Sequence, residues 1–344
     1  MLLTTASSQA VFLLIFMRPI PLHIFNPDTD YARATDGMFY TPPAKVVELR
    51  AHLSLLPALY ASEGDAILLP SECAPEMAPA LPYYEQVALK RIELITWEQL
   101  EKAGKSRVFI PTPWGWDLPL WHKLESVSES LTTLPPRGKI ELIRKLSHRR
   151  TTIEFLREYN RIASFKTELP REYTRTEEAI KEWQNGRTLF YKTPWSSSGR
   201  GIMFTEGLER KHIEPWLRGS IRSQGSVIAE TAYCKKLDYA SEWSITPEGN
   251  VEYLGLSLFE TSPRGKYLRN HNLSQSEINE RISESSSGWN KEIIKAQKSV
   301  LSTLIAPYYA GPLGIDMLTT QDGEIIPCIE INLRRTMGMT GFKI

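Results

Sequence analysis

The chain has 344 residues with 41 Lys and Arg against 40 Asp and Glu, and 42% of its residues are hydrophobic. This length and composition predict two or three compact units with substantial cores. The nearly neutral charge, with both signs interspersed, argues against a nucleic-acid partner. Three widely spaced cysteines argue against a disulfide framework or a Cys-based zinc site and favour a reducing cytoplasm.

Residues 1–16 form an N-terminal extension that contains a short apolar run, Val11 to Phe16, with no basic residue before it. A secretory signal has a basic start and a longer apolar stretch, and a membrane helix needs about 20 apolar residues. We interpret Met17 as the natural start and residues 1–16 as the product of an upstream start. We therefore expect a cytoplasmic protein with no membrane partner.

Residues 17–138 show alternating strand and helix patterns, ending in a polar linker. The predicted elements are strand 22–26, helix 43–61, strand 66–70, helix 83–90 and strands 92–95 and 108–110. This order predicts a small α/β domain with a parallel sheet. We interpret Trp114, Trp116 and Trp121 as packing residues rather than a stacking platform, and Asn26 and Asp28 as an ordinary turn.

The rest of the chain reads as an α+β region with an antiparallel sheet. Helices are predicted at 140–160, 176–185, 209–223 and 289–306, and strands at 187–193, 201–205, 227–233, 241–246 and 251–260. We expect two subdomains here, residues 139–225 and 226–344. The second contains the final hairpin, "GPLGIDMLTTQDGEIIPCIEINLRR".

In this hairpin, alternation places Glu330, Asn332 and Arg334 on one face of a strand whose other face is apolar. A two-residue turn would keep Asp316 away from Glu330. We predict a three-residue loop, Gln321–Gly323, that ends in a left-handed glycine. Asp316 then lies opposite Cys328 and diagonal to Glu330, and Gly314 lies opposite Glu330.

Two carboxylates and an amide oxygen so arranged suit a hard, oxygen-seeking ion such as Mg²⁺. A solvated polar face is the competing interpretation, and the alternation alone does not decide between them. The apolar surroundings of Glu330 and Asn332 favour the metal.

Upstream, a predicted strand delivers Lys192 to the loop of "KTPWSSSGRG". Glycines, hydroxyls and successive N–H groups can hold phosphate oxygens, although a mobile loop has the same composition and the Gly-Lys-Ser/Thr signature is absent. Glu230 ends one predicted strand and Glu242 lies at the start of another; each alone is consistent with a surface acid.

The order of a strand lysine, a Ser/Gly loop, two glutamates, an aspartate and Glu-x-Asn-x-Arg resembles the ATP-grasp superfamily, over about residues 140–344. The C-terminal part resembles the D-alanine–D-alanine ligase and carboxylate–amine ligase branches. The α/β unit before it resembles the pre-ATP-grasp domain. The resemblance therefore implies a pre-ATP-grasp α/β domain followed by an ATP-grasp domain of two α+β subdomains, with ATP and Mg²⁺ as cofactors.

The resemblance also implies site residues. Asp316, Glu330 and Asn332 correspond to Mg²⁺ ligands, Glu230 to the adenine hinge and Glu242 to the ribose-binding acid. Lys192 corresponds to the lysine that contacts the α-phosphate and adenine, and Arg334 to the arginine near the transferred phosphoryl group; the two are the expected catalytic residues. The mobile phosphate loop corresponds to Ser196, Ser197, Ser198 and Gly199, and Arg149 stands in place of a common phosphate-binding lysine.

The sequence departs from the resemblance at two places. Gly314 stands where D-alanine ligases have an arginine, and the chain stops twelve residues after Asn332, where relatives continue with a helix. Arg264, Lys266, Arg269 and Asn270 could meet a substrate carboxylate or phosphate, or form a solvated basic loop.

The resemblance implies an ATP-dependent ligase that joins a small-molecule carboxylate to an amine, or to a thiol, through an acyl phosphate. The alternatives are a small-molecule kinase of the same fold and a nucleotide-binding regulatory protein without turnover. A homodimer remains open, and the sequence does not identify the carboxylate or the amine.

Overall fold

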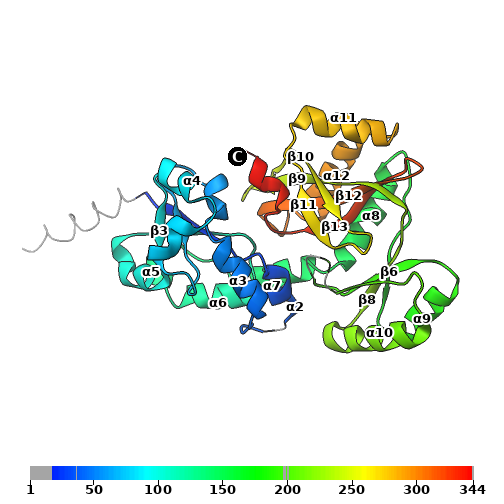
Figure 1. The fold of residues 1–344 in the computed structure, drawn as a ribbon, viewed down its shortest axis with the longest axis horizontal. Coiled ribbons are helices and arrows are strands. Elements are labelled where there is room, and N and C mark those ends of the chain that lie inside the picture. The colour runs from blue at the N-terminus through cyan, green and yellow to red at the C-terminus, as the bar shows by residue number, and fades with distance from the viewer. Residues whose placement is uncertain (1–17, 36, 197–198, 200, 343–344) are drawn as a thin grey trace, which may run out of the picture. The chain divides into compact units, whose positions relative to one another are not determined.

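The structure is a computed structural model that describes residues 18–35, 37–196, 199 and 201–342 (Figure 1). It divides into two compact units. The first comprises residues up to 27 together with 38–137, and the second comprises 28–37 and 138–344. The predicted start at Met17 and residues 1–16 lie outside the described residues, as do Ser197 and Ser198 of the predicted phosphate loop.

The first unit is built on a four-stranded parallel sheet with the strand order β3-β2-β1-β4, which confirms the predicted α/β class. The strands are β1 (Ile20–Ile24), β2 (Ala66–Leu68), β3 (Glu93–Ile95) and β4 (Phe109–Pro113). Its α-helices are α3 (Ala44–His52), α4 (Tyr84–Leu89), α5 (Trp97–Ala103) and α6 (Leu118–Glu125). Its short 3₁₀ helices are η1 (Leu56–Leu59), η2 (Pro75–Ala80), η3 (Gly104–Ser106) and η4 (Ser128–Ser130).

Three features of this unit bear on the sequence predictions. The helix predicted at 43–61 ends at His52, and η1 follows with Pro57 near its start. The ring of Trp114 packs edge-on against Phe25, as expected of a packing residue. The turn predicted at Asn26 and Asp28 is present at residues 27–28. The side-chain amide of Asn26 donates to Gly115 O and Asp117 Oδ2, which ties the segment after β1 to the segment after β4.

The second unit contains two sheets. The smaller has the order β5-β8-β6-β7, from β5 (Arg171–Tyr173), β8 (Val227–Thr231), β6 (Leu189–Lys192) and β7 (Ile202–Phe204). The helices α9 (Thr176–Gln184) and α10 (Arg210–Gln224) pack against each other beside it (Figure 1). This sheet continues past the subdomain boundary predicted at residue 225, because β8 is hydrogen-bonded to both β5 and β6.

The larger sheet has the order β11-β10-β9-β12-β13, and its neighbouring strands are antiparallel. The strands are β9 (Lys235–Ile245), β10 (Val251–Thr261), β11 (Tyr267–Asn270), β12 (Gly311–Thr320) and β13 (Ile325–Asn332). The helices α8 (Arg150–Ile162) and α12 (Lys291–Leu304) pack on each other, α8 against β13 and α12 against β10. The remaining elements are α2 (Thr29–Ala34), α7 (Arg137–Leu146), α11 (Gln275–Ser285) and the 3₁₀ helix η5 (Gly338–Gly341).

The helix predicted at 140–160 is two helices, α7 and α8, separated near Arg149. At the break, the Arg149 N–H donates to Pro194 O and the Arg150 N–H donates to His148 Nδ1. These bonds replace the continuing helical pattern and bring Arg149 beside the loop that follows β6.

The hairpin of β12 and β13 has the predicted three-residue loop, because Thr320 N–H donates to Glu324 O and Gly323 has φ +84°. The predicted register is wrong further along. Asp316 pairs directly with Glu330, and Gly314 pairs with Asn332, because a bulge follows Asp316. Pro327 in the partner strand has no N–H to donate, which accounts for the interrupted ladder.

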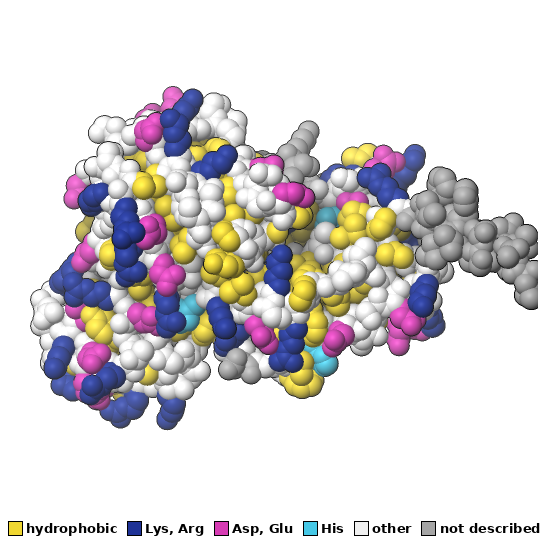
Figure 2. Space-filling view, turned by 180° about the vertical axis from the view of Figure 1, so that it is seen from behind, with side chains coloured by type: hydrophobic (Ala, Val, Ile, Leu, Met, Phe, Trp, Pro, Cys, Tyr) yellow, Lys and Arg dark blue, Asp and Glu magenta, His cyan; other side chains and the backbone are white. Residues whose placement is uncertain are grey.

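Within the described ranges, no helix is both long and apolar enough to cross a membrane. On the face shown in Figure 2, Lys and Arg side chains are interspersed with Asp and Glu side chains. This distribution agrees with the mixed charge of the sequence.

Candidate nucleotide and metal site

A pocket of about 520 Å³ lies between the two sheets of the second unit. One wall comes from β6, β7 and β8, and the other comes from β9, β10, β12 and β13. Its apolar lining includes Phe190, Ile202, Phe204, Phe259, Leu318 and Ile329, and its charged lining includes Lys192, Glu230, Asp238, Asp316 and Glu330. An apolar cavity with a few convergent charged groups is the usual form of a cofactor site.

At the end of the pocket on the smaller sheet, Lys192 and Glu230 form a buried ion pair. The Lys192 ammonium lies 2.5 Å from the Glu230 carboxylate, and both side chains are less than 10% exposed. The ring of Phe190 stacks with the ring of Phe204 at a centroid distance of 4.8 Å. This end therefore offers an apolar surface for a flat ring beside a cation and an anion.

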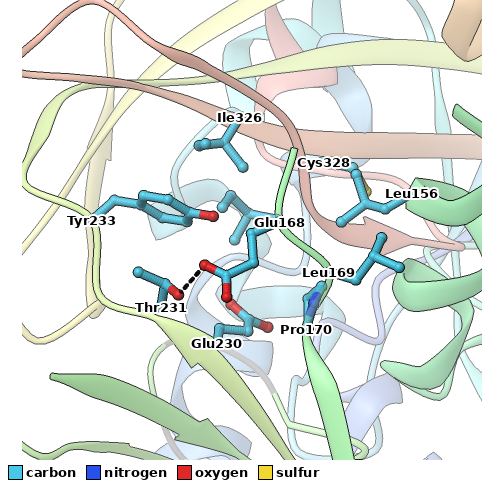
Figure 3. Close-up of a pocket in the computed structure, with 10 residues that line it drawn as sticks. Leu156, Glu168, Leu169, Pro170, Glu230, Thr231, Tyr233, Ile326 and Cys328 are labelled. Atoms are coloured by element: carbon cyan, nitrogen blue, oxygen red, sulfur yellow. Dashed lines mark hydrogen bonds between the residues drawn. The ribbon is translucent and has the colours of Figure 1, made fainter. Parts of the chain in front are cut away.

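A second, smaller cavity of about 20 Å³ adjoins the pocket at Glu230 and Tyr233, which line both (Figure 3). Leu156, Leu169 and Cys328 close its far side. Thr231 donates a 2.8 Å hydrogen bond to Glu168, which ties β8 to the segment before β5. The cavity has room for about one water molecule.

Asp316 and Glu330 are direct neighbours on β12 and β13 and face the pocket. Burial, followed by repulsion from Glu330 and Glu242, raises the pKa of Asp316 to about 7. Asn332 donates to Asp316 Oδ2 at 3.2 Å and accepts from Arg334 through its own oxygen at 2.9 Å. Ionising the Asp316 carboxyl beside Glu330 is thus costly without an added cation.

The three predicted metal residues are therefore together. Among the described residues there is no cluster of three or more His, Cys, Asp or Glu side chains that could hold a metal. The predicted set is not such a cluster, because its third ligand, Asn332, is an amide. A cation held by all three would require Asn332 to turn its oxygen, rather than its nitrogen, toward Asp316. The donors themselves are the hard oxygens that Mg²⁺ prefers.

Arg149 connects the loop after β6 with the metal residues. Its guanidinium donates to Thr193 O at 2.6 Å, to Ser196 Oγ at 2.7 Å and to Glu330 Oε1 at 2.8 Å. The side chain of Arg149 is only 4% exposed. The structure therefore brings the predicted phosphate residues Arg149 and Ser196 next to Glu330.

The predicted loop residue Gly199 packs against the turn between β10 and β11. A Cβ on Gly199 would lie 2.6 Å from the Cα of Lys266. The predicted substrate residues of that turn do not converge. Arg269 forms a two-point ion pair with Glu260, Asn270 accepts from Tyr267, and the Arg264, Lys266 and Arg269 side chains are exposed.

The environment of Glu242, the predicted ribose-binding acid, does not suit a bound ribose. Glu242 is fully buried, and its Oε1 accepts from Ser257 and Thr336. It pairs with Gly314, two residues before Asp316 on β12, and does not line the pocket. Burial raises the pKa of Glu242 to about 7.

Asp238, four residues earlier on β9, lines the pocket with Lys192 and Glu230. Residues on one strand face recur at every second position, so Asp238 and Glu242 share a face, with Ala240 opposite Asp316 between them. Asp238 is thus the acid of β9 that lines the pocket, and it was not among the predicted site residues. The role of the ribose-binding acid was predicted for Glu242, because that residue matched the resemblance.

Arg334 lies just past the end of β13, and its guanidinium is fixed on both sides. Its Nε donates to Asp30 Oδ2 at 2.7 Å and its Nη2 donates to Asn332. Burial alone would lower the pKa of Arg334, but the charges of Asp30 and Glu330 raise it. The predicted catalytic arginine is thus connected through Asn332 to the carboxylates.

Sequence comparisons find no matching protein family and no similar curated protein. Comparison with solved structures shows that the chain has the ATP-grasp fold, as the sequence predicted.

Among these structures is a biotin carboxylase from Campylobacter jejuni in complex with β,γ-ATP, with a TM-score of 0.55 and 12% identity, over 94% of this chain and 67% of that one. Another is N5-carboxyaminoimidazole synthetase from Staphylococcus aureus with ADP, with a TM-score of 0.50, 12% identity and coverage of 94% and 72%. A third is the biotin carboxylase domain of a Hydrogenobacter thermophilus 2-oxoglutarate carboxylase with MgADP, ADP and bicarbonate, with a TM-score of 0.52, 12% identity and coverage of 94% and 66%.

Proposed function

We propose that this protein is an ATP-dependent ligase that joins a carboxylate to an amine, or to a thiol, through an acyl phosphate. The observation that carries the proposal is the single pocket in which Lys192 and Glu230 on one sheet face Asp316 and Glu330 on the other. The shared fold supports it, because the three solved structures described above were determined with adenine nucleotides.

In this proposal the adenine ring lies between the apolar walls near Phe190 and Leu318, with Glu230 at its edge. Asp238, rather than Glu242, accepts from the ribose hydroxyls, because only Asp238 lines the pocket. The triphosphate then extends along β12 toward Asp316. Lys192 on β6, Ser196 in the loop that follows it, and Arg149 between α7 and α8 neutralise its oxygens.

Asp316, Glu330 and Asn332 would hold Mg²⁺ on the phosphates. The raised pKa of Asp316 fits this assignment, since a bound cation would relieve the repulsion between the two carboxylates. When bound, the ion supplies charge neutralisation at the β- and γ-phosphate oxygens. Arg149 would exchange its present contact with Glu330 for a phosphate oxygen.

The reaction proceeds in two substitutions. A carboxylate oxygen of the substrate attacks the γ-phosphorus and ADP leaves, which forms the acyl phosphate. The amine lone pair then attacks the acyl carbon, the C–O bond to phosphate breaks, and the departing phosphate takes up the proton that the amine loses. Arg334 stabilises the phosphoryl charge in both steps, and the other residues of the site hold the reacting groups in position.

The decisive experiment for this function is a screen of carboxylates and amines in pairs, with ADP, phosphate and the organic product measured by mass spectrometry. We expect ADP and phosphate in equal amounts with an amide product. A phosphorylated metabolite that accumulates in the presence of amine would indicate the kinase alternative. Nucleotide binding with no turnover for any pair would indicate a regulatory protein.

A further inference from the structure

The short helix α2 (Thr29–Ala34) carries two charged residues, Asp30 and Arg33. Asp30 contacts the side chain of Arg334, and Arg33 contacts the backbone just before it. Although residues 28–37 are flanked in sequence by segments of the first unit, they belong to the second unit. Asp30 and Arg33 are buried, at 8% and 1% exposure. Asp30 lies 304 residues before the arginine that it contacts.

Asp30 divides its two oxygens between two arginines. Its Oδ2 accepts from Arg334 Nε at 2.7 Å, and its Oδ1 accepts from Arg33 Nη1 at 3.1 Å. Arg33 in turn donates to Leu333 O at 2.9 Å, and its own carbonyl accepts from Arg144 Nε at 2.7 Å. Both the side chain of Arg334 and the backbone just before it are therefore fixed from α2.

The contacts of Arg334 determine which of its hydrogens can meet a ligand. A guanidinium has five N–H donors in a planar fork. Asp30 takes the Nε hydrogen, Asn332 takes one on Nη2, and the Arg335 carbonyl takes one on Nη1 at 3.2 Å. These bonds leave one hydrogen on each terminal nitrogen, and two N–H donors of one guanidinium can bind two oxygens of one phosphoryl group.

We propose that Asp30 is a positioning residue for phosphoryl transfer: it holds Arg334 in the orientation that presents both terminal nitrogens to the transferred group. This inference rests on the ligase function proposed above. Asp30 does not touch nucleotide in this arrangement, so its loss acts on the site through Arg334, directly and through the Arg33 contact with the backbone just before it. The ground-state affinity for nucleotide is set by the pocket and does not depend on it.

The test compares two ligands by calorimetry, Mg-ADP alone and Mg-ADP with aluminium fluoride, which mimics the phosphoryl group in transfer. The wild-type protein is expected to bind the fluoride complex at least tenfold more tightly than Mg-ADP. Asp30→Asn should bind Mg-ADP within twofold of wild type and lose that tenfold gain. Asp30→Glu keeps the charge but displaces it, and should also lose the tighter binding of the fluoride complex. This variant replaces Asp30→Asn in the test if Asp30→Asn does not fold.

Two further variants separate positioning from general destabilisation. Arg334→Ala should lose the gain, and adding Asp30→Asn to it should cause no further loss, because both changes remove one interaction. Asp65→Asn removes another buried carboxylate, paired with His23 in the first unit, and should keep the gain.

Retention of the full gain in either Asp30 variant, or additive losses in the double variant, would overturn the inference while leaving the proposed function intact. A wild-type protein that binds Mg-ADP but shows no gain with fluoride would overturn both.

Discussion

Asp316 and Glu330 face each other directly across β12 and β13, at the only point of the hairpin, among the described residues, where two acids are paired. Like charges in this position destabilise a sheet unless a cation compensates them. In this structure Arg149 lies against Glu330 and Asn332 lies against Asp316. Replacing one acid of this pair is therefore the most specific test of the proposed Mg²⁺ site.

Glu330→Ala should remove most of the dependence of ATP binding on Mg²⁺. Loss of one charged ligand is expected to weaken Mg-ATP binding by about tenfold to a hundredfold, and to leave binding without Mg²⁺ nearly unchanged. Titration calorimetry with and without Mg²⁺ measures both. Glu324→Ala, an exposed acid of the same hairpin, is the matched control. Unchanged Mg-ATP affinity in the Glu330 variant would exclude it as a ligand.

Asp238→Ala should remove the preference of the protein for a nucleotide with ribose hydroxyls. The wild-type protein is expected to bind ATP about tenfold more tightly than 2′,3′-dideoxy-ATP, since two hydrogen bonds to a charged acceptor are lost. A general weakening of nucleotide binding lowers both affinities equally and so leaves their ratio unchanged. Glu242→Gln should keep the ratio; the reverse result would restore Glu242 as the ribose acid.

Glu242 should make the stability of the protein depend on pH. Its pKa is raised from 4.5 to about 7 in the folded state, so the folded state holds the proton more tightly than the unfolded state. This contribution is complete below about pH 4.5 and is lost as the pH rises through about 7. The loss amounts to roughly 3 kcal/mol.

Glu242→Gln keeps an oxygen for Ser257 and Thr336 and cannot ionise. We therefore expect the variant to gain stability relative to wild type at pH 8 and to differ little at pH 5. Urea unfolding at both pH values measures the difference. An equal effect of the substitution at both values would show that Glu242 does not titrate in this range.

Gly338→Ala should destabilise the second unit. A Cβ at this position would lie 2.2 Å from Glu242 Oε1 and 2.3 Å from Ser257 Oγ, so η5 must move from the sheet. We expect a loss on the order of 1–3 kcal/mol by urea unfolding. Gly341→Ala is the control, since its Cβ would have nothing within 4 Å. Equal stability of the two variants would contradict the close packing of η5.

The sequence predicted the fold because its local signals agree with the tertiary structure. Parallel strands in the first unit, the hairpin loop with left-handed Gly323 and the clustering of Asp316, Glu330 and Asn332 all follow from periodicity and turn chemistry. The register could not be predicted, because the bulge depends on how Pro327 interrupts a ladder formed only in the sheet. Asp30 had no local signal, since its partner Arg334 is distant in sequence and meets it only through packing.

The central claim is that the substrate carboxylate becomes an acyl phosphate. The direct measurement uses the active carboxylate with ¹⁸O in its carboxyl group, together with ATP, Mg²⁺ and the amine, and analyses the released phosphate by mass spectrometry. Because the carboxylate oxygen that attacks phosphorus leaves with it, each phosphate should carry one ¹⁸O atom. Unlabelled phosphate beside a labelled amide would contradict the acyl-phosphate mechanism.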